Sequence, residues 1–118
     1  MRFRSMSFRI QKKELLRGLR AMRAGRLRMR SDGDEKIVLT AIDLETTAAI
    51  ELYAMVKSPG EVIVDAEALS NSASAFVEGE LTFWSDIEVI YDDYLRVVLT
   101  QGQRSAHLSG LPVKMRGF

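Results

Sequence analysis

Two stretches with helical periodicity, set among runs of alternating apolar and polar residues, constrain the fold of this chain more than any other feature. The first covers residues 11–24, where Leu15, Leu19 and Met22 recur at the spacing of one helix face. Good helix-forming residues fill most of the stretch, and Gly25 is a natural stop. The pattern predicts one amphipathic helix near the N-terminus.

The second helical stretch follows Asp65, a residue type that caps helix N-termini. We expect this helix to cover residues 65–78. The side opposite its apolar stripe is small and uncharged, with serine and asparagine between positions 70 and 74. The predicted apolar stripe consists of Ala66, Leu69, Ala73, Phe76 and Val77.

The rest of the chain consists of strand-like runs joined by short polar turns, such as residues 31–35 and 57–61. The order is strand, helix, several strands, helix and several strands. This order predicts an α+β fold in which both helices pack side by side on one face of a curved antiparallel sheet. The predicted strands are residues 6–10, 26–30, 36–42, 46–56, 62–64, 81–84, 87–91, 95–100 and 105–110.

The segment TAIDLETTAAIEL, residues 40–52, changes from apolar to acidic and back to apolar without a proline or a glycine. Asp43, Leu44 and Glu45 must therefore reverse or offset the chain within very few residues. An aspartate side chain can bond its own backbone and so favours a tight turn. The alternative is that the two acidic residues provide catalytic carboxylates or a magnesium site.

The net charge of +1 hides a strong asymmetry along the chain. The first 30 residues contain eleven Lys and Arg and one acid, Glu14, which gives +10; the remainder contains six bases and fifteen acids, which gives −9. At about 100° per residue, Lys13, Arg17 and Arg20 share one face of the first predicted helix. One interpretation is a solvated face plus a basic extension over residues 1–5. The other is a surface that binds a polyanion.

Length and composition exclude several kinds of site. A chain of 118 residues is long enough for a single core, so we expect one domain over residues 1–118. The absence of cysteine excludes disulfides, thiolate catalysis and cysteine-ligated zinc. One histidine cannot form a cluster, and the sequence has no nucleophile elbow or glycine-rich phosphate loop. We therefore expect no enzymatic activity, metal, cofactor or small-molecule substrate.

The hydrophobic pattern also bears on the compartment. No apolar run approaches the roughly 20 residues that a membrane span needs. The arginine-rich N-terminus is followed by a charged amphipathic stretch instead of the apolar centre of a signal peptide. We expect a cytoplasmic protein without membrane contact.

Aromatic residues and the single histidine offer two further candidate functions. Phe83, Trp84, Tyr91 and Tyr94 could form a stacking surface for single-stranded nucleic acid, although such residues more often lie in a core or an interface. His107 lies in an alternating run, where a structural imidazole is commoner than a general base. Neither feature predicts catalysis.

Four segments, in register, resemble a known family. They are MSFRIQKKELLRGL, KIVLTAIDLETTAAIEL, GEVIVDAEALSNSASAF and LRVVLTQGQRSAHLSGLP. Together they resemble the first domain of the bacterial beta sliding clamp, the beta subunit of DNA polymerase III, over most of the chain. The most specific part is the DLE of Asp43 to Glu45 between two strands, and the resemblance implies that it is a structural turn.

Three departures limit what the resemblance implies. The family usually has a longer connection with a Leu-Pro segment before the strand at 26–30, so a DNA contact from that loop has no counterpart here. Residues 79–86 look like an insertion. The sequence ends at Phe118, where a bacterial clamp continues into two further domains, so we expect the groove for polymerase peptides between those domains to be lacking.

The resemblance implies a DNA-facing role for the first helix, because both helices of each clamp domain line a central hole around duplex DNA. Cations that face phosphates without reading bases give weak, salt-sensitive and sequence-independent contact, which sliding requires. The candidate phosphate partners are Lys12, Lys13, Arg17, Arg20 and Arg23.

The expected function is that of a clamp-like, DNA-associated protein in replication, acting as a homo-oligomeric ring and processivity factor. Encirclement by single domains would need about six copies joined head to tail through strand edges. Residues 95–100 could offer one edge and residues 36–56 the other. The alternative is a non-encircling interaction module that competes for, or modulates, replication proteins.

Overall fold

The structure, a computed structural model, describes residues 6–22, 25–42, 48–89 and 93–111, and the side chains of all of these except residues 86–95 and 111. Within these residues the chain forms two α-helices, α1 (Lys12–Met22) and α2 (Ala66–Ser74). The strands are β1 (Ser7–Gln11), β2 (Arg26–Ser31), β3 (Lys36–Ala41), β4 (Ala49–Tyr53), β5 (Met55–Ser58), β6 (Glu61–Asp65), β7 (Glu80–Val89), β8 (Asp93–Gln101) and β9 (Arg104–Leu111).

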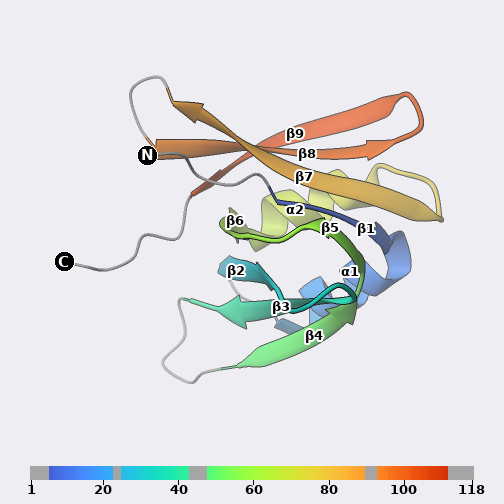
Figure 1. Ribbon diagram of the computed structural model, residues 1–118. Coiled ribbons are helices and arrows are strands. Elements are labelled where there is room, and N and C mark those ends of the chain that lie inside the picture. The colour runs from blue at the N-terminus through green and yellow to red at the C-terminus, as the bar shows by residue number, and fades with distance from the viewer. Residues whose placement is uncertain (1–5, 23–24, 43–47, 90–92, 112–118) are drawn as a thin grey trace.

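These strands form one antiparallel sheet in the order β4-β3-β2-β6-β9-β8-β7-β1-β5 (Figure 1). The element order β1-α1-β2-β3-β4 repeats as β6-α2-β7-β8-β9. The first strand of each half pairs with the other half, because β1 lies beside β7 and β6 lies beside β2. The two halves are therefore interlocked by an exchange of strands.

The sheet curves until its two ends approach each other. β4 and β5 are consecutive in the chain but occupy opposite ends of the sheet order. The amides of Ala54 and Val56 donate to the carbonyl oxygens of Glu35 and Asp34, at 3.0 and 2.8 Å. These bonds tie β5 to the turn between β2 and β3, so the curved sheet almost closes on itself.

Both helices pack together on one face of this sheet, as the sequence predicts, and contact each other directly. α1 lies against β1, β3 and β4, whereas α2 lies against β6 and β9. The predicted helix over 11–24 is confirmed, but it starts one residue later because Gln11 still pairs with Glu80 as the last residue of β1. The antiparallel α+β prediction is thus confirmed.

The N-terminus of α2 has the predicted cap. The carboxylate of Asp65 accepts a hydrogen bond of 2.8 Å from the amide of Ala68, and the cap residue itself has extended backbone angles. Acidic Glu67 in the first turn adds a favourable interaction with the helix dipole. This end of α2 follows directly from its local sequence.

The C-terminus of α2 lies before the predicted one. The helix ends at Ser74, and the amide of Phe76 bonds the carbonyl of Ala73, three residues back, which tightens the last turn. Val77 consequently leaves the helical stripe and is 60% exposed. Its predicted place in the apolar stripe is wrong.

Two strand predictions also need correction. The predicted strand over residues 46–56 is interrupted at Ala54, which lies between the end of β4 and the start of β5. The run at 81–84 and residues 87–89 of the next predicted run belong instead to the single strand β7, and residues 90–91 lie outside the described ranges. Residues 79–86 include the part of β7 that pairs with both β1 and β8, and their status as an insertion stays a prediction. The predicted turn at 43–45 lies outside the described residues.

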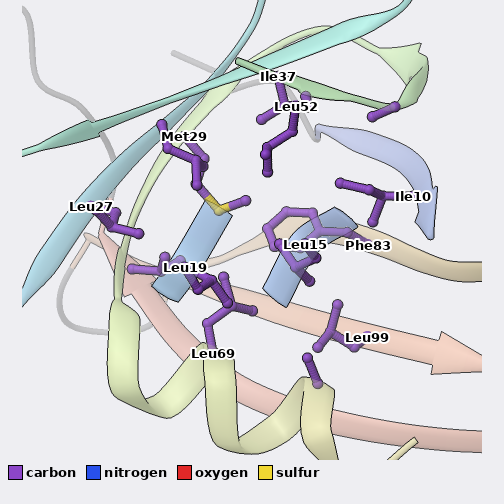
Figure 2. Close-up of a cluster of buried hydrophobic side chains, with 14 of the residues drawn as sticks. Ile10, Leu15, Leu19, Leu27, Met29, Ile37, Leu52, Leu69, Phe83 and Leu99 are labelled. Atoms are coloured by element: carbon purple, nitrogen blue, oxygen red, sulfur yellow. The ribbon is translucent and has the colours of Figure 1, made fainter. Parts of the chain in front are cut away.

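Side chains from both helices and both halves of the sheet meet in one core (Figure 2). Leu15 of α1 and Leu69 of α2 are fully buried, and each contributes about 1.5–3 kcal/mol by burial. The core side chains labelled in the close-up are Ile10, Leu15, Leu19, Leu27, Met29, Ile37, Leu52, Leu69, Phe83 and Leu99. This core fixes the orientation of α1 and therefore decides which of its residues face outward.

Candidate functional site

The outer face of α1 carries the cations expected there. Lys13, Arg17 and Arg20 are exposed, while Leu15 and Leu19 on the opposite side are buried. Lys13 and Arg20 make no hydrogen bond or ion pair with any residue that the structure describes. Their charged groups are therefore available to an anion.

Arg17 is held by Glu14, one turn earlier on α1. Its Nε and Nη2 atoms donate to Oε1 and Oε2 of that carboxylate at 3.0 and 2.9 Å. The hydrogen bonds from Arg17 lower the pKa of Glu14, and the same bonds raise the pKa of Arg17. The three-residue spacing permits this pair on a helix, so the sequence contained a signal for it. The Glu14 carboxylate therefore offsets the charge that Arg17 presents to a phosphate, and the donors of Nη1 are the ones not used in these bonds.

The same ion pair covers part of the outer edge of β4. The amide of Tyr53 donates to Oε2 of Glu14 at 2.9 Å, and Nη2 of Arg17 donates to the carbonyl oxygen of Glu51 at 3.3 Å. Because β4 is the last strand of the sheet, none of the described strands bonds these backbone groups on this side. α1 thereby protects a stretch of open sheet edge.

Lys12 points into the molecule, unlike the other described cations of α1. Its Nζ atom donates to the carbonyl oxygens of Phe76 and Ser74 at 2.6 and 3.5 Å, and lies 4.0 Å from Oε1 of Glu78. The side chain is 13% exposed. Carbonyl groups at a helix C-terminus lack helical partners and attract cations, so Lys12 joins the start of α1 to the end of α2. Its predicted contact with phosphate stays a prediction.

Neither Arg23 nor α2 adds a cation to the surface that the structure describes. Arg23 lies outside the described residues, so its phosphate contact also stays a prediction. α2 contains no Lys or Arg, and its exposed residues include Asn71 and Ser74 together with acidic Glu67. The cationic surface formed by these helices therefore belongs to α1.

The neighbouring aromatic residues of β7 point to opposite faces of the sheet. Phe83 is fully buried and stacks on Phe8, with 4.6 Å between ring centroids. Trp84 is half-buried on the other face, where the guanidinium carbon of Arg96 lies 5.4 Å from the ring centroid. Phe83 is therefore a core residue, the commoner place for such a side chain, and cannot stack on a bound base; Tyr91 and the side chain of Tyr94 lie outside what the structure describes.

His107 is exposed on β9, and its Nε2 atom lies 3.5 Å from Oγ of Ser105.

No group of three His, Asp or Glu side chains in the described ranges is arranged to hold a metal ion. None of the helices in the described part of the chain has the length and apolar character needed to cross a membrane.

The open strand edges differ from the predicted pair. β8 pairs with β7 on one side and with β9 on the other, so the prediction that residues 95–100 offer a free edge is wrong. β9 pairs with β6 only at Gly110 and Leu111, which leaves residues 104–109 with one strand neighbour among the described strands. Among the described strands, the open edges are therefore β4, within the predicted 36–56 region, the first part of β9, and β5, which pairs only with β1 and is tied to the turn between β2 and β3.

Solved structures of two other proteins contain a domain with this architecture. The fold is similar to the C. crescentus beta sliding clamp, with a TM-score of 0.76 and 21% sequence identity over 97% of this chain and 32% of that one. It is also similar to the beta subunit of the Streptococcus pyogenes DNA polymerase, with a TM-score of 0.73 and 18% identity over 95% of this chain and 32% of that one. The chain thus has the fold of a single clamp domain and spans about a third of these proteins.

Sequence comparison is less informative than structure comparison. No protein-family model matches the sequence, and no curated protein matches it. The resemblance noted in the sequence is supported at the level of fold, at identities near one residue in five.

Proposed function

We propose that this protein is a non-enzymatic, clamp-like DNA-associated protein that contacts duplex DNA through the outer face of α1. The observation that carries the proposal is the placement of Lys13, Arg17 and Arg20 together on the exposed side of a helix in a clamp-domain fold. Point charges on one helix face suit phosphates and do not read base edges. The contact is therefore independent of DNA sequence and weakens with salt.

The three cations differ in what binding requires of them. Lys13 and Arg20 can meet phosphate directly, because neither has a partner among the described residues. Arg17 can offer Nη1 while it stays paired with Glu14, but its charge is then already offset by that carboxylate. A phosphate that also took Nη2 would uncover the carbonyl oxygen of Glu51 at the edge of β4.

A single domain is too small to surround a duplex, so encirclement requires self-association. The outer edge of β4 and residues 104–109 of β9 are suitable for a head-to-tail contact, because each lies on the third strand after the helix of its half and each has one strand neighbour among the described strands. Such a contact closes into a ring if the rotation between neighbours is right, with about six copies by analogy with clamp rings. In this arrangement the protein acts as a processivity factor in replication.

DNA contact is tested by a pair of matched double variants. Lys13→Glu/Arg20→Glu and Arg30→Glu/Lys57→Glu each change the formal net charge from +1 to −3, and all four side chains are exposed. We expect the α1 variant to lose retention on duplex DNA at low salt while the control retains it, both with near wild-type stability. Arg17 stays unchanged so that Glu14 keeps its partner. Equal retention by both variants would refute the α1 contact.

The alternative function is a non-encircling module that competes for replication proteins. Light scattering well above micromolar protein, with and without duplex, separates the two functions. A ring gives a mass of several chains that rises when DNA is added, since DNA relieves repulsion among the basic surfaces. A mass of one or two chains in every condition would replace the ring by the competing module.

A further inference from the structure

A separate hollow lies where β1, β5 and β7 run side by side, on strands that carry none of the α1 cations. Its volume is about 430 Å³, within the range of pockets that bind small ligands or short peptide segments. Arg9 and Lys57 provide its charged lining, Ser7 and Thr82 its hydroxyl groups, and Met55 an apolar side chain that is 58% exposed. The lining contains no acidic residue.

This hollow forms at an irregularity in the sheet. Ser7 pairs with Ser58, but Phe8 pairs with Val56, so Lys57 is one residue in excess on β5. A β-bulge of this kind redirects a side chain out of the regular alternation and is common beside binding sites. Lys57 is exposed and makes no hydrogen bond or ion pair with the described residues. The bulge therefore directs an unpaired ammonium group at the rim.

Arg9 is only loosely held within the protein. Its Nη2 atom lies 2.9 Å from Sδ of Met55, a weak acceptor, and its Nη1 atom lies 3.8 Å from Oε1 of Glu80. Both partners of that ion pair are about half exposed, and exposed pairs of this length contribute little. The guanidinium is free to turn toward a better carboxylate.

The surroundings argue against a nucleic-acid strand as the occupant. On the other side of Arg9 lies a second hollow of about 290 Å³, lined by Tyr53, Met55, Glu35 and Glu80 among others. A phosphate backbone that continued past Arg9 would meet these carboxylates. A short acidic segment confined to the first hollow would not, and Met55 offers a surface for one apolar side chain.

We propose that the hollow at the β1–β5 bulge binds an acidic peptide segment of a partner protein, with carboxylates on Arg9 and Lys57 and an apolar side chain on Met55. This surface differs from the outer face of α1. Peptide binding therefore does not depend on the proposed DNA contact.

The probe is a blocked hexapeptide in which Leu alternates with Asp, titrated into isotope-labelled protein and followed by amide chemical shifts. We expect saturable shifts at residues 7–9 and 55–57, at least a tenfold weaker affinity for Lys57→Glu, and a severalfold weaker one for Met55→Ala. Lys57→Arg should bind nearly as the wild type, which separates lost charge from lost folding. Lys13→Glu/Arg20→Glu should bind the peptide normally even though it loses DNA.

Several results would overturn the proposal. They are unchanged affinity in Lys57→Glu, equal binding of a hexapeptide in which Leu alternates with Lys, and shifts centred on α1. Inorganic phosphate alone producing the same saturable shifts would reduce the hollow to a simple anion site. Tighter binding of a single-stranded oligonucleotide than of the acidic peptide at residues 7–9 and 55–57 would assign it to nucleic acid.

Discussion

Gly110 lies where β9 joins β6, which is the junction in the sheet between the strands β4-β3-β2-β6 and the strands β9-β8-β7-β1-β5. A Cβ atom there would lie 2.8 Å from Cγ2 of Val62, 3.0 Å from Cγ2 of Val97 and 3.1 Å from the carbonyl oxygen of Ile63. Valine side chains are stiff at χ1, and the carbonyl belongs to the backbone of β6. None of these neighbours can move away without disturbing the sheet.

The Gly110→Ala substitution therefore has two opposing effects on the free energy of unfolding. Replacing glycine within a strand gains roughly 0.5–1 kcal/mol through the lower entropy of the unfolded chain. Overpacking a tight interior costs roughly 1–3 kcal/mol. We expect the second effect to win, with a net loss of about 1–2 kcal/mol in the free energy of unfolding.

Urea unfolding followed by circular dichroism measures this loss directly, and thermal unfolding should show a midpoint lower by about 4–8 °C. Ser109→Ala, at the exposed neighbouring position, is the control and should stay within about 0.5 kcal/mol of wild type. Because Val62→Ala removes the nearest contact, Gly110→Ala should cost at least about 0.5 kcal/mol less in that background. Equal or higher stability of Gly110→Ala, or strictly additive costs, would refute the steric argument.

Two further predictions concern the polar contacts of α1. Lys12→Met should lower the free energy of unfolding by about 1.5–3 kcal/mol in urea titrations, because it removes charged hydrogen bonds to the end of α2. Unchanged stability would contradict this role; weaker retention on duplex DNA per folded molecule would support the predicted phosphate contact of Lys12. The pKa of Glu14 is below its ordinary value of 4.5, so its contribution to stability is present above about pH 4.5 and is lost as the pH falls through the lowered pKa. Glu14→Gln should therefore be less stable than wild type at pH 7 and approach it in acid; a difference that is constant from pH 7 to pH 3 would contradict the pairing with Arg17.

The two helices and most strands were predictable because their signals are local. The spacing of Leu15, Leu19 and Met22 and the cap at Asp65 depend on a few consecutive residues. The break at Ala54 was not predictable in this way, since the residues on both sides read as one strand. β4 and β5 are separate strands because they form the two opposite ends of the curved sheet. That arrangement is a property of the whole fold.

The candidate site also has a part that local sequence predicts and a part that it does not. The shared face of Lys13 and Arg20 follows from helix geometry, and the structure places both at the surface. Lys12 resembles its neighbour in sequence, but its amino group meets the carbonyl of Phe76, 64 positions away. The hollow beside Lys57 depends on a bulge between strands distant in sequence, so no local pattern could reveal it.

The exchange of first strands between the two halves has a consequence for how this protein forms during synthesis. Ser7 pairs with Trp84, 77 positions further along the chain, and Phe8 stacks on Phe83. A ribosome must therefore make β7 before β1 can complete its pairing, and until then the aromatic ring of Phe8 lacks its partner. Contacts this distant slow folding and leave apolar surface open to other chains. Because β1 pairs with β7 and β2 pairs with β6, the emerging N-terminal half should not fold stably before the second half follows.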